Sequence, residues 1–244
     1  MTSFGDDAAR VHDLIVREAC DPGVMSGSIA WLQCLCRAAT RALPVTGAAI
    51  SVMAAGSSQG LAAASDTRSK MVEELQFTLG EGPCLEAYAK GRPVLAPDLA
   101  GESGARWPAY SSAAVQHGVE AVFAFPLRIG VAQLGVLDMY RARPGELSYD
   151  ALELAQAFAR VALTGLLDVH DSIGSEQLAQ ELTQASHYRV EVYQAAGMLQ
   201  VQLGVDSEAA LVRLRAEAFL QGRRVGEVAR DIIDRKITLE RDQG

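Results

Sequence analysis

Gln133-Leu134-Gly135-Val136-Leu137-Asp138-Met139-Tyr140 is the stretch that decides the fold of the larger part of this chain. Its side chains alternate, and the run just before it, Phe123-Ala124-Phe125-Pro126-Leu127, is apolar, as paired strands with one buried face require. Further upstream, residues 48–54 and 60–65 are short apolar runs that flank a connection suited to a hairpin. The sequence therefore predicts a sheet of antiparallel strands.

Helical periodicity lies on either side of these strands. Residues 26–43 predict an amphipathic helix, with Ser26 or Ser28 as its N-cap. From Tyr149 onward apolar residues recur every three or four positions, which predicts a long helix that leaves the strands and is interrupted at Gly174-Ser175.

An apolar repeat resumes after that interruption. Its positions are Leu178, Leu182, Ala185, Val192, Leu199 and Leu203. Such a seam can pair two chains as a coiled coil, so it predicts a homodimer. The alternative is a lone amphipathic helix that folds back on the domain before it.

Glycine, proline and aromatic motifs run in a fixed order through residues 26–165. They are Leu79-Gly80-Glu81-Gly82-Pro83-Cys84-Leu85-Glu86-Ala87-Tyr88, Gly91-Arg92-Pro93-Val94, Pro97-Asp98-Leu99, Arg106-Trp107-Pro108, Gly118-Val119, Phe125-Pro126-Leu127, Leu134-Gly135-Val136-Leu137 and Tyr140. This part of the chain resembles a GAF domain. The resemblance implies an α/β (α+β) sensor with a central antiparallel sheet, which commonly binds a small molecule between the sheet and the loops over one face.

Several residues expected around that sheet face are candidates for a ligand pocket. They are Phe77, Cys84, Trp107, Phe123, Phe125 and Tyr140, with Asp138 as a polar anchor. Apolar pockets and cores use the same residue types, so each of them can equally belong to the core. The four histidines have no metal-ligand spacing and no cofactor motif is present, so we expect neither metal nor cofactor and leave a small ligand unidentified.

Gly82-Pro83 predicts a tight turn into a helix, because proline suits the first helical position and glycine tolerates any φ. Cys84 then lies in the first helical turn, where unpaired amides and the helix dipole lower the pKa of a thiol. One interpretation is a redox-sensitive thiolate. The other is a small buried residue filling a loop pocket, with the nearby Glu86 opposing ionisation.

Small and apolar residues recur at set spacings in roughly the last fifty residues. They are Ala195, Gly197 and Leu199, then Ala210, Leu214-Arg215 and Ala218, then Arg223-Arg224, Val225, Val228-Ala229 and Ile232-Ile233. This segment resembles the ANTAR family, three-helix RNA-binding modules that act as transcription antiterminators in bacteria. Small residues at Ala195, Gly197, Ala210, Ala218 and Ala229 would let the helices approach closely.

Arginines are the candidates for contacts with structured RNA, because guanidinium groups donate to phosphates and splayed bases. They are Arg213, Arg215, Arg223, Arg224 and Arg230. The alternative is solvated arginine paired with Glu217, Glu227 and Asp231 at helical spacings. Two departures bear on binding, since Ala196 stands where the ANTAR family usually has lysine and Leu211 where it usually has an aromatic residue.

Charge is distributed unevenly along the chain. From His187 onward there are nine Arg or Lys and nine Asp or Glu, so the preceding part carries the whole net charge of −8. A neutral segment is not the electrostatic footprint of a general nucleic-acid binder. We therefore expect no DNA partner, and only local, shape-specific binding to RNA.

Composition excludes several other classes. No apolar stretch is long enough to span a bilayer and the acidic start does not resemble a signal peptide, so we expect a cytoplasmic protein without a membrane partner. In a reducing compartment the four cysteines predict no disulfide framework, and Cys34 and Cys36 are expected only to pack. We expect no enzyme activity, because no constellation of nucleophile and base stands out.

These observations divide the chain into an N-terminal segment (1–25), a GAF-like sensor (26–165), a helical or coiled-coil connector (166–186) and an ANTAR-like module (187–238). The function that follows is a signal-responsive transcription antitermination regulator, in which the sensor detects a small ligand or a redox signal. The alternative is a degenerate ANTAR module that serves dimerisation or protein interaction without binding RNA.

Overall fold

The computed structural model describes residues 4–18, 28–53, 59–130, 132–184, 187–223 and 225–239. It divides into two compact units, of which the larger comprises residues 1–77 and 81–179 and the smaller residues 78–80 and 180–244. Within the described ranges no helix is long and apolar enough to cross a membrane.

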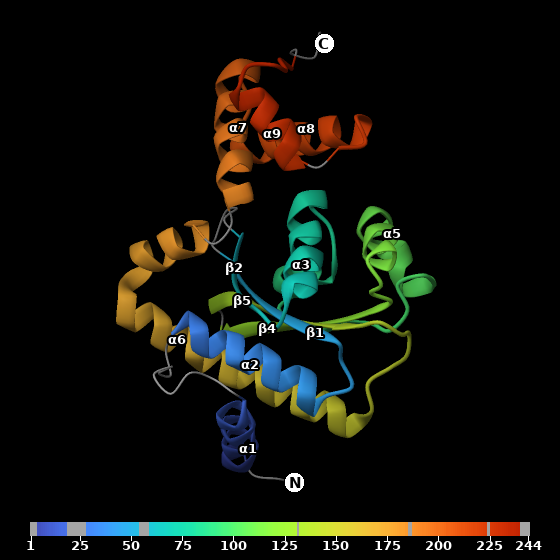
Figure 1. The fold of residues 1–244 in the computed structure, drawn as a ribbon, viewed down its shortest axis with the longest axis vertical. Coiled ribbons are helices and arrows are strands. Elements are labelled where there is room, and N and C mark those ends of the chain that lie inside the picture. Colours follow the sequence, from blue (N-terminus) through green and yellow to red (C-terminus); the bar gives the residue numbers. More distant parts are fainter. Residues whose placement is uncertain are drawn as a thin grey trace. The chain divides into compact units, whose positions relative to one another are not determined.

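The larger unit is built on a five-stranded antiparallel sheet (Figure 1). Its strands are β1 (Gly47–Met53), β2 (Gln59–Ala64), β3 (Val94–Ala96), β4 (Ala121–Ile129) and β5 (Ala132–Arg141), in the order β2-β1-β5-β4-β3. The alternating run at residues 133–140 forms the central strand, paired with β1 on one side and β4 on the other. The predicted mixed α/β fold with an antiparallel sheet is therefore confirmed.

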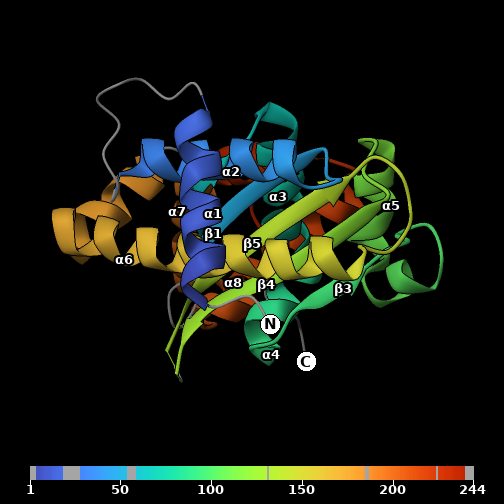
Figure 2. The ribbon, with the colours of Figure 1, turned by 90° about the horizontal axis from the view of Figure 1, so that it is seen from below.

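Helices cover both faces of this sheet (Figures 1 and 2). On one face lie α2 (Ile29–Ala42) and α6 (Tyr149–Gln184), with α1 (Phe4–Arg17) packed against α2. On the other face lie α3 (Thr67–Leu79), α4 (Pro83–Lys90), the 3-10 helix η1 (Glu102–Arg106) and α5 (Pro108–Gln116).

Local sequence signals account for several helix boundaries. Ser28 caps α2, because its hydroxyl accepts a hydrogen bond from the Trp31 amide at 3.2 Å, as predicted. The predicted interruption at Gly174-Ser175 is wrong, since α6 runs through both residues to Gln184. Glycine and serine lower helix stability by about 1 kcal/mol or less each, which a long packed helix can absorb.

The cysteines of α2 behave differently from each other. Cys36 is a free, buried thiol, as expected. Cys34 is disulfide-bonded, so the expectation that it only packs is wrong. Sequence spacing does not show which thiols a fold brings within bonding distance.

From residue 187 onward, the described part of the smaller unit forms three helices, α7 (His187–Leu203), α8 (Ser207–Leu220) and α9 (Val225–Ile233). Asp206 caps α8, its carboxylate accepting from the Ala209 amide at 2.8 Å. The core is made of Val192, Ala195, Ala196, Leu199, Leu203, Ala210, Leu211, Leu214, Ala218, Val225, Val228, Ala229 and Ile232. Its five alanines allow the helix axes to approach closely.

This core uses residues that the sequence assigned to a seam between two chains. Val192, Leu199 and Leu203 of the predicted coiled-coil seam are buried among the three helices, and the other seam side chains lie outside the described residues. An apolar stripe at helical spacing predicts a buried face but not whether its partner is another chain or the same one. Gly197, predicted to pack, instead lies on the exposed face of α7.

Two mid-helix glycines provide a matched test of this packing. A Cβ at Gly165 of α6 would lie 2.3 Å from a ring carbon of Trp31 in α2, whereas a Cβ at Gly197 meets nothing within 4 Å. Gly165→Ala is expected to destabilise the larger unit by about 1–3 kcal/mol, despite the better helix propensity of alanine. Gly197→Ala is expected to stabilise the smaller unit by about 0.5–1 kcal/mol. Denaturant unfolding followed by circular dichroism measures both changes, and a stabilising Gly165→Ala would contradict the α2–α6 contact.

Candidate functional site

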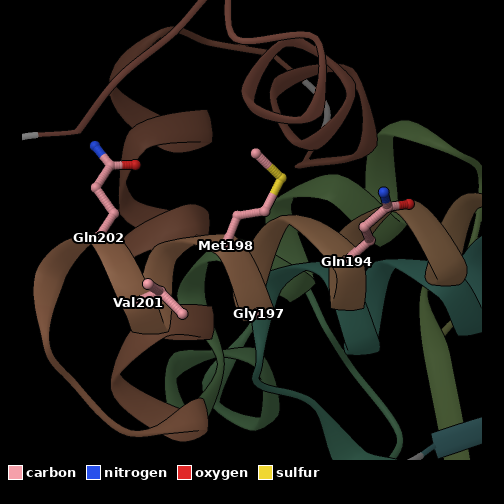
Figure 3. Close-up of a pocket in the computed structure, with 5 residues that line it drawn as sticks. All are labelled: Gln194, Gly197, Met198, Val201 and Gln202. Atoms are coloured by element: carbon pink, nitrogen blue, oxygen red, sulfur yellow. The ribbon is translucent and has the colours of Figure 1, made fainter.

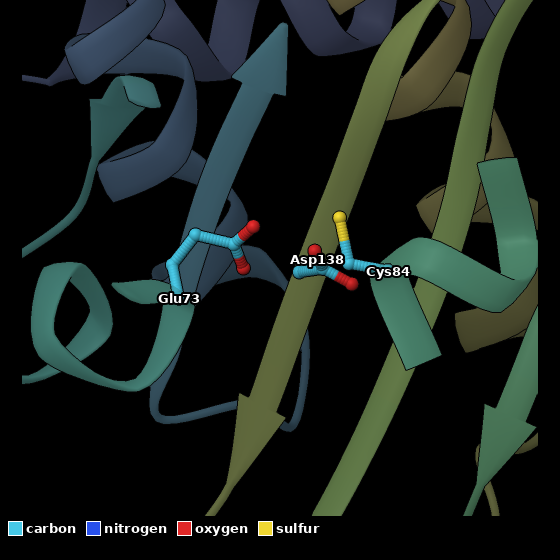
Figure 4. Close-up of side chains that lie close together, drawn as sticks. All are labelled: Glu73, Cys84 and Asp138. Atoms are coloured by element: carbon cyan, nitrogen blue, oxygen red, sulfur yellow. The ribbon is translucent and has the colours of Figure 1, made fainter. Parts of the chain in front are cut away.

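A cluster of buried polar side chains lies between the sheet and the helices α3 to α5. Asp138 and Tyr140 come from the central strand β5, Glu73 from α3, Cys84 from α4 and Tyr110 from α5. None of the five is more than 3% exposed. Figure 4 shows the side chains of Glu73, Cys84 and Asp138 converging from their three elements, and their ligand-type atoms all lie within 4.8 Å of one another.

Glu73 is the best-satisfied member of this cluster. Its Oε1 accepts a hydrogen bond from the Ser51 hydroxyl on β1 at 2.6 Å. Its Oε2 accepts from the Gln76 amide at 2.9 Å and from the Tyr140 hydroxyl. Three donors thus fix the carboxylate between α3, β1 and β5.

Gln76 connects Glu73 to the turn that carries Cys84. While its amide nitrogen donates to Glu73, its Oε1 accepts from the Cys84 backbone N–H at 2.8 Å. The turn residue Gly82 has φ 145° and lies so close that a Cβ there would be 2.4 Å from Gln76 Oε1. The predicted Gly82-Pro83 turn is confirmed, and α4 begins at Pro83. Glycine at this position is therefore needed to bring Cys84 beside Glu73.

Asp138 and Tyr110 are the unsatisfied members. Both carboxylate oxygens of Asp138 and the hydroxyl of Tyr110 are buried and make no hydrogen bond of standard geometry with the described residues, although Glu73, Gln76 and Cys84 lie close enough to Asp138 to affect its pKa. A buried polar group without a partner costs roughly 1–3 kcal/mol, and more if it is charged. Two such groups in one cluster are an exception that calls for a physical explanation.

Burial dominates the titration of the cluster. It raises the pKa of Asp138, and the neighbouring Glu73 carboxylate raises it further. Burial likewise raises the pKa of the Cys84 thiol, with Asp138 and Glu73 adding to the effect. Desolvation and two nearby carboxylates thus favour the interpretation of Cys84 as a small buried residue over that of a thiolate activated by the helix N-terminus.

The other predicted pocket residues do not join this cluster. Directly opposed residues of paired strands point to the same face, and Phe123 and Phe125 of β4 oppose Met139 and Leu137, the neighbours of Asp138 in β5. The two phenylalanines therefore lie on the face opposite Asp138.

The remaining two candidates, Phe77 and Trp107, are buried on the helical elements of the larger unit. The guanidinium carbon of Arg106 lies 4.2 Å from the centroid of the Trp107 ring. This contact at the start of α5 is a cation–π interaction within the fold.

Sequence reasoning missed Glu73, Gln76 and Tyr110. A signal for the first two exists in α3, where the buried positions Ser69, Val72, Glu73, Gln76 and Phe77 follow helical spacing. Polar residues inside such a buried stripe must find partners, so Glu73 and Gln76 could have been identified as members of a polar cluster. Tyr110 carries no comparable signal.

In the smaller unit, one face of α7 is hollowed. A shallow groove of about 530 Å³ is lined by Gln194, Gly197, Met198, Val201 and Gln202 (Figure 3). The Val201 side chain is 83% exposed. This face lies opposite the alanines that α7 buries in the three-helix core.

The candidate RNA-binding arginines that the structure describes have protein partners. Arg223 donates to Asp231 at 2.7 Å, and Arg230 donates to both carboxylate oxygens of Glu191 at 2.9 Å. Arg213 and Arg215 are half-buried and also engaged. Arg224 lies outside the described residues. Pairing of Arg223 with Asp231, the alternative drawn from helical spacing, is thus present.

The two departures from the ANTAR pattern have a structural explanation. Ala196 and Leu211 are 1% and 5% exposed, so both belong to the core rather than to a surface that could contact RNA. An exposed aromatic residue is present elsewhere, since Phe219 at the end of α8 is 75% exposed. The turn after α8 brings the Arg223 amide within 3.0 Å of the Ala218 carbonyl, so the backbone of Arg223 returns to the last turn of α8, which carries Phe219.

The raised pKa of Asp138 gives a test of the buried cluster. The unfolded chain loses the Asp138 proton near pH 4, at a lower pH than the folded chain does. The free energy of unfolding therefore has its full value, as far as Asp138 is concerned, below about pH 4. It decreases as the pH rises through the folded-state pKa of Asp138. We expect Asp138→Asn, unfolded in denaturant with EDTA present, to be more stable than wild type at pH 7, with a gain that vanishes below pH 4. The exposed control Glu146→Gln should show no such pH-dependent gain, and equal pH profiles for Asp138→Asn and wild type would disprove the burial effect.

Comparison with known families finds two matches in this chain. A GAF domain matches residues 31–165 and an ANTAR domain matches residues 180–233. Comparison with curated proteins finds no significant match.

Solved structures similar to the larger unit include two GAF domains of phosphoenolpyruvate-protein phosphotransferases. The one from Acinetobacter is 15% identical with a TM-score of 0.51, covering 70% of this chain and 98% of that chain. The one from Coxiella burnetii is 12% identical with a TM-score of 0.51, covering 69% of this chain and 95% of that chain. At these identities the similarity shows the fold alone. Since the GAF match spans more than half of the residues, the chain belongs to the GAF domain family, with an ANTAR domain following its GAF domain.

Proposed function

We propose that this protein is a signal-responsive regulator of transcription antitermination, in which the GAF domain detects a small ligand and the ANTAR domain binds structured, hairpin-forming RNA. The observation that carries the proposal is the presence of both domains in one chain, linked by a single continuous helix, α6, that starts in the GAF match and ends in the ANTAR match. A sensor and an output module joined in this way can be coupled if the ligand favours one of two states of the connection.

Ion pairs in the ANTAR domain are compatible with RNA binding. The pairs of Arg223 with Asp231 and of Arg230 with Glu191 lie at the surface, where such pairs contribute about 0–1 kcal/mol. A phosphate group can therefore replace the carboxylate at small cost. The exposed ring of Phe219 at the end of α8 supplies a flat surface on which an unpaired base can stack.

The proposal includes a homodimer acting in the cytoplasm, without a membrane or DNA partner. Because Val192, Leu199 and Leu203 are used within the three-helix core, a second copy would have to use another face of the ANTAR domain. The exposed groove around Gly197 and Val201 on α7 is such a face.

A second candidate function is a degenerate ANTAR domain that serves dimerisation or protein interaction without binding RNA. The pairing of Arg223 and Arg230 with carboxylates favours it, as does the net charge of zero from residue 187 onward. This alternative expects no RNA retention even at low salt, together with a dimer in sedimentation equilibrium.

Phosphate contact by Arg223 is tested with a salt-titrated mobility shift, using tandem-hairpin RNA and a control with scrambled loops. We expect Arg223→Ala to weaken binding and to lower the slope of log affinity against log salt by about one. The matched control is Arg92→Ala, which removes the same charge from an exposed position of the GAF domain. Equal effects of both substitutions would leave only non-specific electrostatics and contradict a site at Arg223.

Base stacking on Phe219 is tested in the same assay. We expect Phe219→Ala to cost about 1–3 kcal/mol of binding free energy, roughly a 5- to 150-fold loss of affinity, with an unchanged salt slope. Val212→Ala is the control, because Val212 is also exposed on α8. Undiminished binding by Phe219→Ala would remove this residue from the RNA surface.

A further inference from the structure

The buried cluster of the GAF domain contains a carboxylate that its surroundings do not satisfy. Asp138 is fully buried and neither of its oxygens receives a hydrogen bond from the described residues. The Tyr110 hydroxyl beside the cluster is equally buried and without a partner. A group that supplies positive charge and accepts several ligands at once would satisfy these atoms.

We propose that Glu73, Cys84 and Asp138 bind a divalent transition-metal ion of borderline softness, such as Zn²⁺ or Fe²⁺, inside the GAF domain. The proposal names the chemical class of the ligand at the sensor site, and in that respect it rests on the proposed function. Binding itself is independent of RNA.

The geometry of the three side chains suits one ion. Zinc lies about 2.3 Å from a thiolate sulfur and about 2.0–2.2 Å from a carboxylate oxygen, so in a tetrahedral site its ligand atoms lie about 3.4–3.6 Å apart. The three ligand atoms here lie within 4.8 Å of one another. Side-chain rotations that move these atoms by up to about 1 Å bring them into the coordination range.

The chemistry of the ligands selects the class of metal. Magnesium and calcium prefer six or more oxygen ligands, which a closed site with two carboxylates and a cysteine does not provide. A thiolate combined with carboxylates suits a borderline ion instead. The cluster is no more than 3% exposed at any ligand, and a bare ion fits such a closed space better than an organic molecule does.

The residues around the ligands hold them as metal sites require. Glu73 is oriented by the donors Ser51, Gln76 and Tyr140, and Gln76 also accepts from the backbone N–H of Cys84. Such hydrogen bonds fix the direction in which a ligand presents its lone pairs.

A purely structural polar cluster explains less of the arrangement. Buried networks that serve only stability satisfy their members, as the three donors to Glu73 do. Asp138, on the central strand, faces the same cluster and receives none of them. The unsatisfied carboxylate of Asp138 is thus the one that lies beside the Glu73 carboxylate and the Cys84 sulfur, both of which can bind a metal.

Cobalt(II) titration of the full-length protein tests the proposal, because cobalt replaces zinc and reports its ligands by absorption. We expect one cobalt per chain and a thiolate-to-cobalt charge-transfer band in the near ultraviolet. Cys84→Ser should lose the band. Asp138→Asn should weaken binding by about 100-fold or more, since even loss of a residue that orients a ligand typically costs about 10- to 100-fold.

Two controls keep the test decisive. Cys36→Ser removes the other free buried thiol, which lies on α2, and should keep both the stoichiometry and the band. Asp138→Asn is expected to fold at least as well as wild type without metal, so its loss of cobalt would not reflect unfolding. Folded wild-type protein that binds less than stoichiometric cobalt, or a band that survives in Cys84→Ser, would overturn the proposal. Neither readout involves RNA, so failure here and failure of RNA binding are separate results.

Discussion

The hydrogen bonds that converge on Glu73 are the constraint on which the GAF domain depends. They come from β1, β5 and α3 itself, and through Gln76 they extend to the first turn of α4. A buried carboxylate that loses its hydrogen-bond partners is costly, so these elements cannot move apart without leaving Glu73 unsatisfied. Gly82 belongs to the same constraint, because any side chain at that position would displace Gln76.

The same constraint explains why the domain has two unlike faces. On the face covered by α2 and α6, β4 and β5 present Phe123, Phe125, Leu137 and Met139, which pack without directional demands. On the other face, the polar groups next to Asp138 come from two separate helices, Glu73 from α3 and Cys84 from α4. The apolar face gives the sheet its stability, while the polar face fixes the relative placement of α3, α4 and β5.

The sequence predicted those parts of the structure that depend on local patterns. Alternation identified β5, the Gly82-Pro83 signal identified the start of α4, and Ser28 was one of the two serines expected to cap α2. Local patterns could not show whether a buried residue packs against its own chain or against a second chain. The stripe through Val192 and Leu199 predicts a partner for α7 equally well whether that partner is α8 or a second chain, because both bury apolar area in the same way.

The candidate site was predictable only in part, for a related reason. Cys84 and Asp138 were identified individually, one from its turn and the other as a polar residue in an apolar strand. Their proximity to Glu73 comes from the order of strands and helices, which brings together residues from distant parts of the chain. Spacing rules for metal sites describe ligands from one loop or helix, so they do not detect a site assembled by topology.

A closed site also limits how a signal can act on this protein. A ligand shifts an equilibrium only by the difference in its affinity for the two states, and a shift from 1:99 to 99:1 requires a difference of about 5.5 kcal/mol. A ligand held by α4 alone would bind both states equally if α4 moved as a rigid unit, and would shift nothing. A ligand held at once by Glu73 of α3, Cys84 of α4 and Asp138 of β5 loses contacts whenever these elements separate. Its whole binding free energy then favours the state in which α3, α4 and β5 are together over the state in which they are apart. A sensor domain needs this difference in affinity.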